Sequence, residues 1–240
     1  HFFLTESENF ALRPEKVRKA LKEHDGEGTE KLDLLFLCSP NNPTGQGVGR
    51  EDMEQIARWC RQRNIWLAVD QCFEEFLEEP EAYSVVPALK DFPNLVVFKA
   101  FTKSFAMAGL RLGYALCAST ELAEGLRQVR QPWSVSAVAQ AAGLAALKEK
   151  DFLRQTRSLI AKERPWLSAQ LEKLGMKVYP SQVNYLLFRA PGRENLKEEL
   201  LKREILIRSC ANFTGLGEDT YRVCIRRREE NRQLISALKE

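Results

Sequence analysis

The sequence has few residues suited to metal binding or hydrolytic catalysis. It contains two histidines, His1 and His24, and no C-x-x-C pair among its six cysteines. A Ser-His-Asp triad and a histidine-rich metal site therefore lack their residues. No apolar run approaches the roughly 20 residues that span a bilayer, and the opening HFFLTESENF is too polar for a signal peptide. We expect reduced thiols, no membrane association and a cytoplasmic location.

An excess of charge of one sign is also missing. The chain has 36 lysines and arginines against 33 aspartates and glutamates, for a net charge of +3. This balance argues against a nucleic-acid partner and against binding to an anionic membrane surface. With 44% hydrophobic residues, 240 residues suffice for a sizeable core in one or two domains. Any binding of anions must therefore be local.

Short apolar segments alternate with amphipathic ones in the first part of the chain. LDLLFLC, IWLAVD, LVVFKA and LRLGYALC have the length and composition of strands. Between the first two, Met53, Ile56 and Cys60 recur at helical spacing in REDMEQIARWCRQRN. IWLAVD is almost continuously apolar, which is typical of a strand covered on both faces. The pattern predicts an α/β fold with a doubly wound, mostly parallel sheet.

The second part of the chain has a different pattern. Residues 136–148 predict an alanine-rich helix, and the helical pattern continues to Gly175 with a bend expected near Pro165. The following short strands and helices are typical of a smaller α+β unit. We predict a large domain over residues 1–148 and a small C-terminal domain over residues 149–240.

Three polar or reactive features follow predicted strands. Asp70 ends IWLAVD, SPNNPTG follows LDLLFLC, and Lys103 follows LVVFKA. Each alone also fits an ordinary role as a helix cap, a turn or a solvated charge. Ligands of such sheets bind at the carboxyl ends of the strands. Because functional groups cluster in sites, their coincidence favours a binding or catalytic site.

In order and spacing, these residues resemble the pyridoxal-phosphate-dependent enzymes of the aspartate-aminotransferase superfold. The resemblance implies that Lys103 forms the Schiff base with pyridoxal 5'-phosphate and that Asp70 pairs with the pyridine nitrogen. It also implies that Asn42 hydrogen-bonds the phenolic oxygen and that Arg111, eight residues after Lys103, binds the cofactor phosphate. A carboxylate beside the pyridine nitrogen keeps it protonated, so that the ring acts as an electron sink.

Two positions depart from the wider pattern of this superfold. Phe73 stands where many relatives carry a tyrosine bonded to the phenolic oxygen, and Ala100 where many carry a phosphate-binding hydroxyl. Each change removes a hydrogen bond to the cofactor. By the resemblance, Thr102 and groups outside this chain compensate for the loss.

Within the superfold, the chain resembles the branch of histidinol-phosphate aminotransferases and threonine-phosphate decarboxylases. The similar stretches are QPWSVSAVAQAAGLAAL, QVNYLLFR and ILIRSCANFTGLGEDTYRVCIRRREEN. Phe73 and the run ILIRSCANFTGL favour the decarboxylase. The resemblance implies that Arg222 binds the substrate α-carboxylate, that Arg208 binds the substrate phosphate, and that Asn184 lines the pocket. Both arginines also fit exposed charges at strand edges.

The reaction implied is decarboxylation of L-threonine O-3-phosphate to aminopropanol phosphate, which supplies the cobalamin side chain. An aminotransferase acting on histidinol phosphate or an aromatic amino acid is the alternative, because it uses the same cofactor residues. The resemblance also implies a homodimer. The chain begins inside the large domain, without the N-terminal part where relatives keep a glycine-rich turn and a stacking aromatic ring. A truncated, catalytically silent fragment or binding module therefore remains a further alternative.

Overall fold

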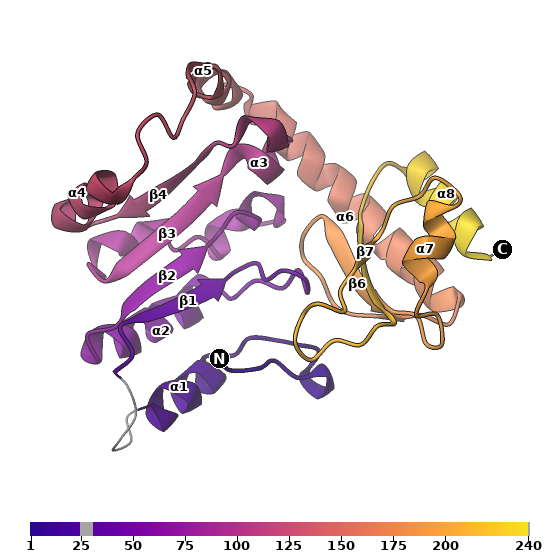
Figure 1. The fold of residues 1–240 in the computed structure, drawn as a ribbon, viewed down its shortest axis with the longest axis horizontal. Helices are drawn as coiled ribbons and strands as arrows, with labels where there is room; N and C mark the ends of the chain where they lie inside the picture. Colours follow the sequence, from indigo (N-terminus) through magenta and orange to yellow (C-terminus); the bar gives the residue numbers. More distant parts are fainter. Residues whose placement is uncertain (25–30, 240) are drawn as a thin grey trace. The chain divides into compact units, whose positions relative to one another are not determined.

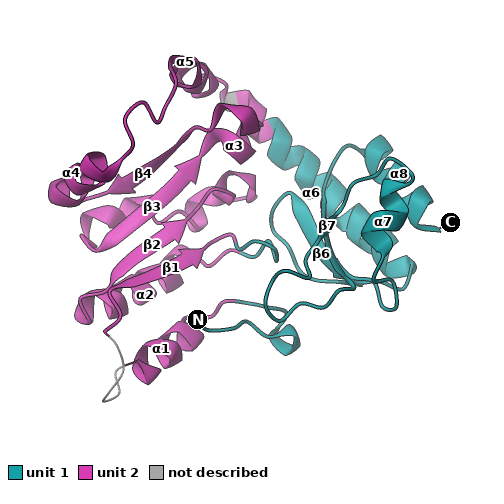
Figure 2. Ribbon diagram, in the orientation of Figure 1, with its two compact units in different colours: residues 1–11, 41–46, 155–240 teal, residues 12–40, 47–154 magenta. Residues whose placement is uncertain are grey.

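The computed structural model describes residues 1–24 and 31–239, with the backbone alone at Lys150. The chain forms two compact units whose segments interleave along the sequence (Figure 2). Unit 1 comprises residues 1–11, 41–46 and 155–240, and unit 2 comprises residues 12–40 and 47–154. The division into domains after residue 148 stays a prediction. Among the described residues, no helix is long and apolar enough to cross a membrane.

Unit 2 is built on a four-stranded sheet in the order β1-β2-β3-β4 (Figure 1). Its strands are β1 (Leu34–Cys38), β2 (Trp66–Asp70), β3 (Leu95–Ala100) and β4 (Gly113–Cys117). β1, β2 and β3 run parallel, and β4 is antiparallel to β3. The predicted α/β fold with a mostly parallel sheet is confirmed.

Helices connect these strands, and one of them buries the face that the sequence predicts. The α-helices of unit 2 are α1 (Pro14–Glu23), α2 (Arg50–Gln62), α3 (Phe101–Ser104), α4 (Thr120–Val129) and α5 (Ala137–Ala146). The 3-10 helices are η2 (Glu74–Phe76), η3 (Pro80–Ala82), η4 (Val86–Lys90) and η5 (Ala108–Leu110). In α2, the predicted apolar positions Met53, Ile56 and Cys60 are buried. The helical spacing of these side chains therefore does place them on one buried face.

One face of this sheet remains open in part. Leu34 and Phe36 are 52% and 58% exposed, and Trp66, paired with Leu34, is 39% exposed. Leu37 and Leu67, on the opposite face, are buried. The expectation that IWLAVD is covered on both faces is therefore wrong at its Trp66 end. The physical reason is the alternation of side chains along a strand, which puts these three residues on the face opposite the buried one.

Unit 1 contains a second four-stranded sheet, in the order β5-β6-β8-β7 with antiparallel neighbours. Its strands are β5 (Lys177–Val178), β6 (Tyr185–Arg189), β7 (Arg208–Ser209) and β8 (Thr220–Cys224). Its helices are η1 (Glu6–Glu8), α6 (Lys150–Lys173, which begins in unit 2), α7 (Leu196–Leu201) and α8 (Arg228–Lys239). Pro165 lies inside α6 and does not end it. The predicted smaller α+β unit thus agrees with these elements.

The first residues of the chain are bound to unit 1 by side-chain contacts. Glu6 Oε1 accepts hydrogen bonds from Tyr179 Oη at 2.6 Å and from Lys177 Nζ at 2.8 Å. The ring of Phe10 packs edge-on against Tyr179, with 5.1 Å between ring centroids. Phe10 and Tyr179 share a buried cluster with Leu187 of β6. These contacts explain why a segment far from β6 in sequence belongs to the same unit.

A buried carboxylate joins α6 to α8. Glu163 Oε2 accepts hydrogen bonds from Arg228 Nε at 2.8 Å and from Asn231 Nδ2 at 3.2 Å. The Arg228 guanidinium also lies 4.3 Å from the ring centroid of Trp166. The hydrogen bond from Arg228 holds the pKa of Glu163 below its ordinary value of 4.5. The ionised carboxylate therefore stabilises unit 1.

We predict that Glu163→Gln lowers the free energy of unfolding by about 1.5–3 kcal/mol at neutral pH, the usual value of a hydrogen bond to a charged group. A lowered carboxyl pKa stabilises the folded state above pH 4.5, and this contribution is lost as the pH falls through the folded-state pKa. Urea titrations of both proteins at several pH values test this. Glu229→Gln, at an exposed position on α8, is the control. A difference between Glu163→Gln and wild type that stays constant down to pH 2 would contradict the account.

Candidate functional site

Asp70 lies at the carboxyl edge of the unit 2 sheet, as the sequence predicts. It is the last residue of β2 and pairs with Cys38 of β1 and Phe98 of β3. The backbone N–H of Cys72 donates a hydrogen bond of 2.9 Å to Asp70 Oδ1. This bond fixes the carboxylate by the chain that immediately follows the strand. Asp70 thus presents a fixed negative charge at the edge where ligands of parallel sheets bind.

Lys103 lies near the loop that follows Asp70. It belongs to α3, its side chain is exposed, and its Nζ is 5.8 Å from the ring centroid of Phe73. Burial raises the pKa of the Cys72 thiol to about 12; hydrogen bonding and the charge of Asp70 add to the rise, and the charge of Lys103 opposes it. Both charged groups are therefore within electrostatic reach of one thiol. The sequence predicted that Asp70 and Lys103 lie at one edge of the sheet, but it did not predict a role for Cys72. The only signal for Cys72 in the sequence is its position two residues after Asp70.

Thr102 and Arg111 flank this pair in the sequence. Thr102 is half-buried in α3, directly before Lys103. Arg111 is exposed, has a left-handed backbone with φ of 54°, and donates a hydrogen bond of 3.1 Å from Nη1 to the carbonyl of Ala108. A non-glycine residue in this conformation is uncommon and is often found at functional sites. Their contacts with a cofactor stay predictions.

In unit 1, Asn42 and Arg222 are in direct contact. The Arg222 guanidinium donates a hydrogen bond from Nη1 to Asn42 Oδ1 and lies 4.8 Å from the ring centroid of Tyr185. The Tyr185 hydroxyl in turn donates to the carbonyl of Asn41 at 2.8 Å. Because the amide oxygen of Asn42 accepts from Arg222, its Nδ2 group is oriented as the donor end. The pair can therefore offer an amide donor and a guanidinium to one anionic ligand.

Gly45 allows the loop of Asn42 to pack closely against unit 1. Its φ is +77°, and a Cβ at this position would come within 2.2 Å of Ser181 Oγ. The backbone N–H of Gln182 donates to the Gly45 carbonyl at 2.8 Å. Only glycine accepts both the left-handed backbone and the close approach. This contact fixes the segment 41–46 against the connection between β5 and β6, in the same sheet as the strand β8 that carries Arg222.

Arg208 and Arg222 form a pair of like charges on neighbouring strands. They are opposed in the antiparallel β7–β8 register, so their Cβ atoms are about 4.5–5.5 Å apart on one face of the sheet. Both guanidinium groups lower the pKa of the Cys210 thiol, against the larger effect of its burial. Arg208 Nη2 also donates to Asn212 Oδ1 at 3.1 Å. Opposed like charges destabilise a sheet, and a bound anion would remove this cost.

Asn184 precedes β6 and has an unsatisfied polar atom. Its backbone carbonyl accepts the N–H of Ile225 at 2.8 Å. Its side-chain Oδ1 is buried, and among the described residues no hydrogen-bond partner for it is found. A buried polar atom without a partner is costly, so it is a candidate contact for a bound ligand.

The predicted residues divide between the two units. Unit 2 contains Asp70, Thr102, Lys103 and Arg111, and unit 1 contains Asn42, Asn184, Arg208 and Arg222. Within unit 2, the charges of Asp70 and Lys103 both act on the pKa of the Cys72 thiol, in opposite directions. Within unit 1, Asn42, Arg208 and Arg222 lie together at one face of the sheet. The unit 2 group contains a carboxylate and an amine that suit covalent chemistry, and the unit 1 group can bind anions.

Comparison with known proteins gives these groups a context. Residues 1–238 match the family described as Aminotransferase class I and II. The chain is 40% identical over 213 residues to the threonine-phosphate decarboxylase of Salmonella typhimurium, covering 88% of this chain and 58% of that protein. It is 35% identical over 212 residues to histidinol-phosphate aminotransferase 2 of Archaeoglobus fulgidus, covering 88% and 59%.

A solved structure agrees with these sequence matches. The histidinol-phosphate aminotransferase of Clostridium acetobutylicum superposes with a TM-score of 0.88 at 28% identity, covering 99% of this chain and 69% of that one. The chain thus spans somewhat more than half the length of the two relatives, 58% and 59%. Because the family match extends over almost the whole sequence, the chain belongs to the class I and II aminotransferase family.

Proposed function

We propose that this chain provides the cofactor and substrate contacts of an enzyme that uses pyridoxal 5'-phosphate to decarboxylate L-threonine O-3-phosphate to aminopropanol phosphate. The observation that carries the proposal is the opposed pair Arg208 and Arg222, with Asn42 bound to Arg222. L-Threonine O-3-phosphate has two anionic groups, a carboxylate and a phosphate. Two adjacent guanidinium groups match such a substrate, because arginine binds both kinds of anion through two parallel hydrogen bonds.

The residues of unit 2 fit the cofactor. Asp70 is a carboxylate fixed by the Cys72 N–H, and Lys103 is an exposed amine close to Phe73. When bound, pyridoxal phosphate supplies an electron sink for negative charge at the substrate Cα. In the proposed arrangement, the Asp70 carboxylate would accept a hydrogen bond from the protonated ring nitrogen. Lys103 Nζ would hold the cofactor and, once released by the substrate amine, would move a proton at the substrate Cα.

The remaining residues bind and orient the cofactor and the substrate. Arg111 holds the cofactor phosphate, with Thr102 as a further hydroxyl donor, and Asn42 Nδ2 donates to the phenolic oxygen of the cofactor. Arg222 holds the substrate carboxylate, Arg208 holds its phosphate, and Asn184 lines the pocket through its unsatisfied Oδ1. Within unit 1, the hydrogen bond from Arg222 orients the Asn42 amide.

An aminotransferase is the second candidate. The match to the histidinol-phosphate aminotransferase of Archaeoglobus fulgidus is 35% identical, against 40% for the decarboxylase. Two adjacent arginines also suit a dicarboxylate such as 2-oxoglutarate, the usual amino-group acceptor. The proposed cofactor contacts are the same for both reactions. The two reactions differ in the bond at the substrate Cα that breaks, which is the bond to the carboxylate in the decarboxylase and the bond to hydrogen in the aminotransferase.

Carbon dioxide release distinguishes the two reactions. We predict that the enzyme releases carbon dioxide from L-threonine O-3-phosphate at the same rate with and without 2-oxoglutarate. Labelled carbon dioxide and glutamate are measured in parallel, with histidinol phosphate as the second amino donor. Glutamate formation without release of carbon dioxide would contradict the decarboxylase and favour the aminotransferase.

We infer a cytoplasmic homodimer from the same resemblance. All six cysteines lie in the described residues, and none of them forms a disulfide there, as is usual in a reducing compartment. Val129, the last residue of α4, is 81% exposed, and Trp133, between α4 and α5, is 97% exposed. Large exposed apolar side chains favour a protein interface at this place, and a second copy of the chain is the partner that the resemblance implies.

A further inference from the structure

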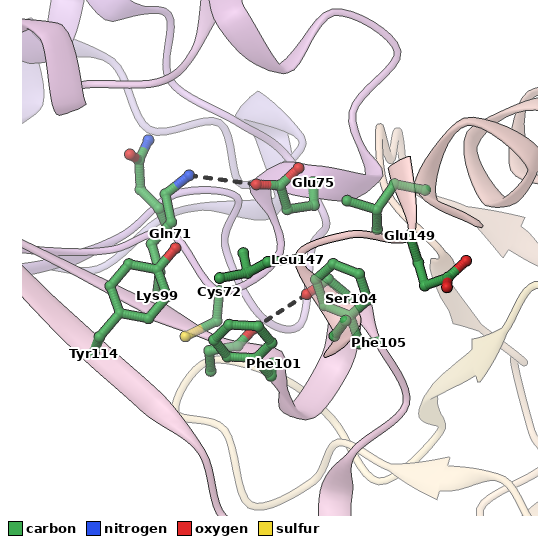
Figure 3. A pocket seen from close by; sticks show the side chains of 13 residues that line it. Gln71, Cys72, Glu75, Lys99, Phe101, Ser104, Phe105, Tyr114, Leu147 and Glu149 are labelled. Atoms are coloured by element: carbon green, nitrogen blue, oxygen red, sulfur yellow. Dashed lines mark hydrogen bonds and ion pairs between the residues drawn. The ribbon is translucent and has the colours of Figure 1, made fainter. Parts of the chain in front are cut away.

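A buried group of charges connects the segments that carry Asp70 and Lys103. Lys99 Nζ lies 2.8 Å from Glu74 Oε2 and 3.7 Å from Glu75 Oε1. The side chains of Lys99 and Glu74 are only 11% and 4% exposed. Figure 3 shows the Lys99 side chain directed toward Glu75. Both residues line a pocket of about 160 Å³. We call Lys99, Glu74 and Glu75 the charge cluster.

The residues of the charge cluster lie close in sequence to Asp70 and Lys103. Glu74 begins η2 four residues after Asp70, and Lys99 lies in β3 four residues before Lys103. The pairing of β2 with β3 ends with Asp70 opposite Phe98, followed by one hydrogen bond of 2.9 Å from Gln71 N–H to the Phe98 carbonyl. Beyond this point, the ion pair continues the connection that the backbone ladder no longer makes.

The loop after Asp70 is tied down by a second contact, from Gln71. Gln71 is buried, its Nε2 donates to the Tyr83 carbonyl at 3.0 Å, and its Oε1 accepts the N–H of Val85 at 3.2 Å. On the other strand, the N–H of Phe101 donates to the Leu112 carbonyl at 3.1 Å. The charge cluster therefore joins two segments that are each ordered, so that fixing one against the other fixes the relative positions of their functional groups.

The composition of the charge cluster is not what stability alone would favour. Burial raises the pKa of Glu74, and the charge of Glu75 adds to the rise, while Lys99 opposes it. Replacing a buried ion pair by apolar residues of similar volume is often neutral or stabilising, so such a pair is weak support for the fold. Its value lies in the specific geometry that closely paired buried charges impose.

We propose that Lys99 and Glu74, assisted by Glu75, are positioning residues that fix the Asp70 carboxylate relative to the Lys103 ammonium. The catalytic consequence of this inference rests on the proposed function. The structural consequence does not, because the charge cluster acts within unit 2 without a ligand. Lys99 itself is engaged by two carboxylates, and its ammonium is therefore not the nucleophile.

The structural consequence is tested on the cofactor-free protein by amide hydrogen exchange. In Lys99→Met, we expect exchange of residues 71–76 and 101–104 to become roughly tenfold faster, with α2 unchanged, because local opening is set by local contacts. Lys99→Arg keeps the charge and should restore slow exchange. Lys90→Met, at an exposed lysine of the same unit, is the matched control. If Lys99→Met does not fold, Glu74→Gln, which keeps side-chain volume and the Lys99–Glu75 contact, gives the same test.

The catalytic consequence is a loss in kcat of about 10²-fold for Lys99→Met, with KM nearly unchanged, because misplacing a reacting group by about 1 Å has this effect. Unchanged exchange in both segments, or faster exchange throughout unit 2, would overturn the proposal whatever the activity. Changed exchange with an unchanged kcat in an active enzyme would overturn the positioning role. If the proposed function were wrong, the wild-type protein would be inactive, but amide hydrogen exchange would still become faster in the Lys99→Met variant.

Discussion

Lys103→Ala is expected to reduce turnover of L-threonine O-3-phosphate by at least about 10⁴-fold, the upper range for loss of a proton-transfer group, because covalent catalysis is lost as well. The side chain is exposed, and its described contact is with the Phe73 ring. Its removal should therefore change the free energy of unfolding by no more than about 0.5 kcal/mol. Steady-state kinetics and urea denaturation of the same preparation measure the two effects.

Lys90→Ala is the control for this substitution, since it removes an exposed lysine of the same unit outside the candidate site. It should retain both activity and stability. A Lys103→Ala protein with more than a tenth of wild-type activity would show that another amine does the chemistry. A Lys103→Ala protein that is inactive because it unfolds would contradict the purely catalytic role given to this lysine.

Arg208→Ala is expected to remove most of the preference for L-threonine O-3-phosphate over L-threonine. Two charge-assisted hydrogen bonds of about 1.5–3 kcal/mol each correspond to a loss in discrimination on the order of 10²–10⁴-fold. Arg222→Ala should instead lower kcat/KM for both substrates alike, because both have the carboxylate. An interaction contributes to specificity only if one substrate makes it and the other cannot. Specificity constants for the two substrates measure the difference.

Arg226→Ala is the matched control for the arginine pair. Arg226 is an exposed arginine of unit 1 in an ion pair of 2.7 Å with Glu230, so its loss should leave the phosphate preference intact. If Arg222→Ala removed the preference and Arg208→Ala weakened both substrates equally, the two roles would be exchanged. If neither variant changed it, a phosphorylated substrate would be excluded, and an amino-acid aminotransferase would become the better account.

The sequence predicted the features that depend on local periodicity. The apolar spacing of Met53, Ile56 and Cys60 gave the buried face of α2, and the apolar run before Asp70 gave β2 with the acid at its carboxyl end. Both follow from the period of a helix or strand, which a single sequence displays. Lys103 was likewise predicted to follow a strand, and it does, in the short helix directly after β3.

The features that depend on distant residues were not predictable in this way. The inclusion of residues 1–11 in unit 1 depends on Glu6 meeting Lys177 and Tyr179, more than 160 residues later. The opposition of Arg208 and Arg222 depends on strand register, and a slip of one residue would turn Arg208 to the other face. The sequence indicates only that Lys99 belongs to an apolar strand, because nothing local shows that two carboxylates lie close to its ammonium.

The open face of the unit 2 sheet shows a further limit of local patterns. The apolar run IWLAVD predicted that β2 is buried on both faces, yet Trp66 is 39% exposed. On the neighbouring strand β1, Phe36 is 58% exposed and stacks on Phe98, with 6.0 Å between ring centroids. The apolar composition of a strand predicts that its faces are buried. It does not identify the segment that covers each face.

The most direct test of the central claim is to locate the lysine that binds the cofactor. The protein is incubated with pyridoxal phosphate, reduced with borohydride, digested and mapped by mass spectrometry, with Lys103→Ala and Lys90→Ala treated in parallel. The account predicts a visible absorbance band before reduction and one pyridoxyl adduct, on Lys103, that is lost only in Lys103→Ala. An adduct on Lys99, or adducts spread over exposed lysines with no absorbance band, would contradict it and favour a catalytically silent module.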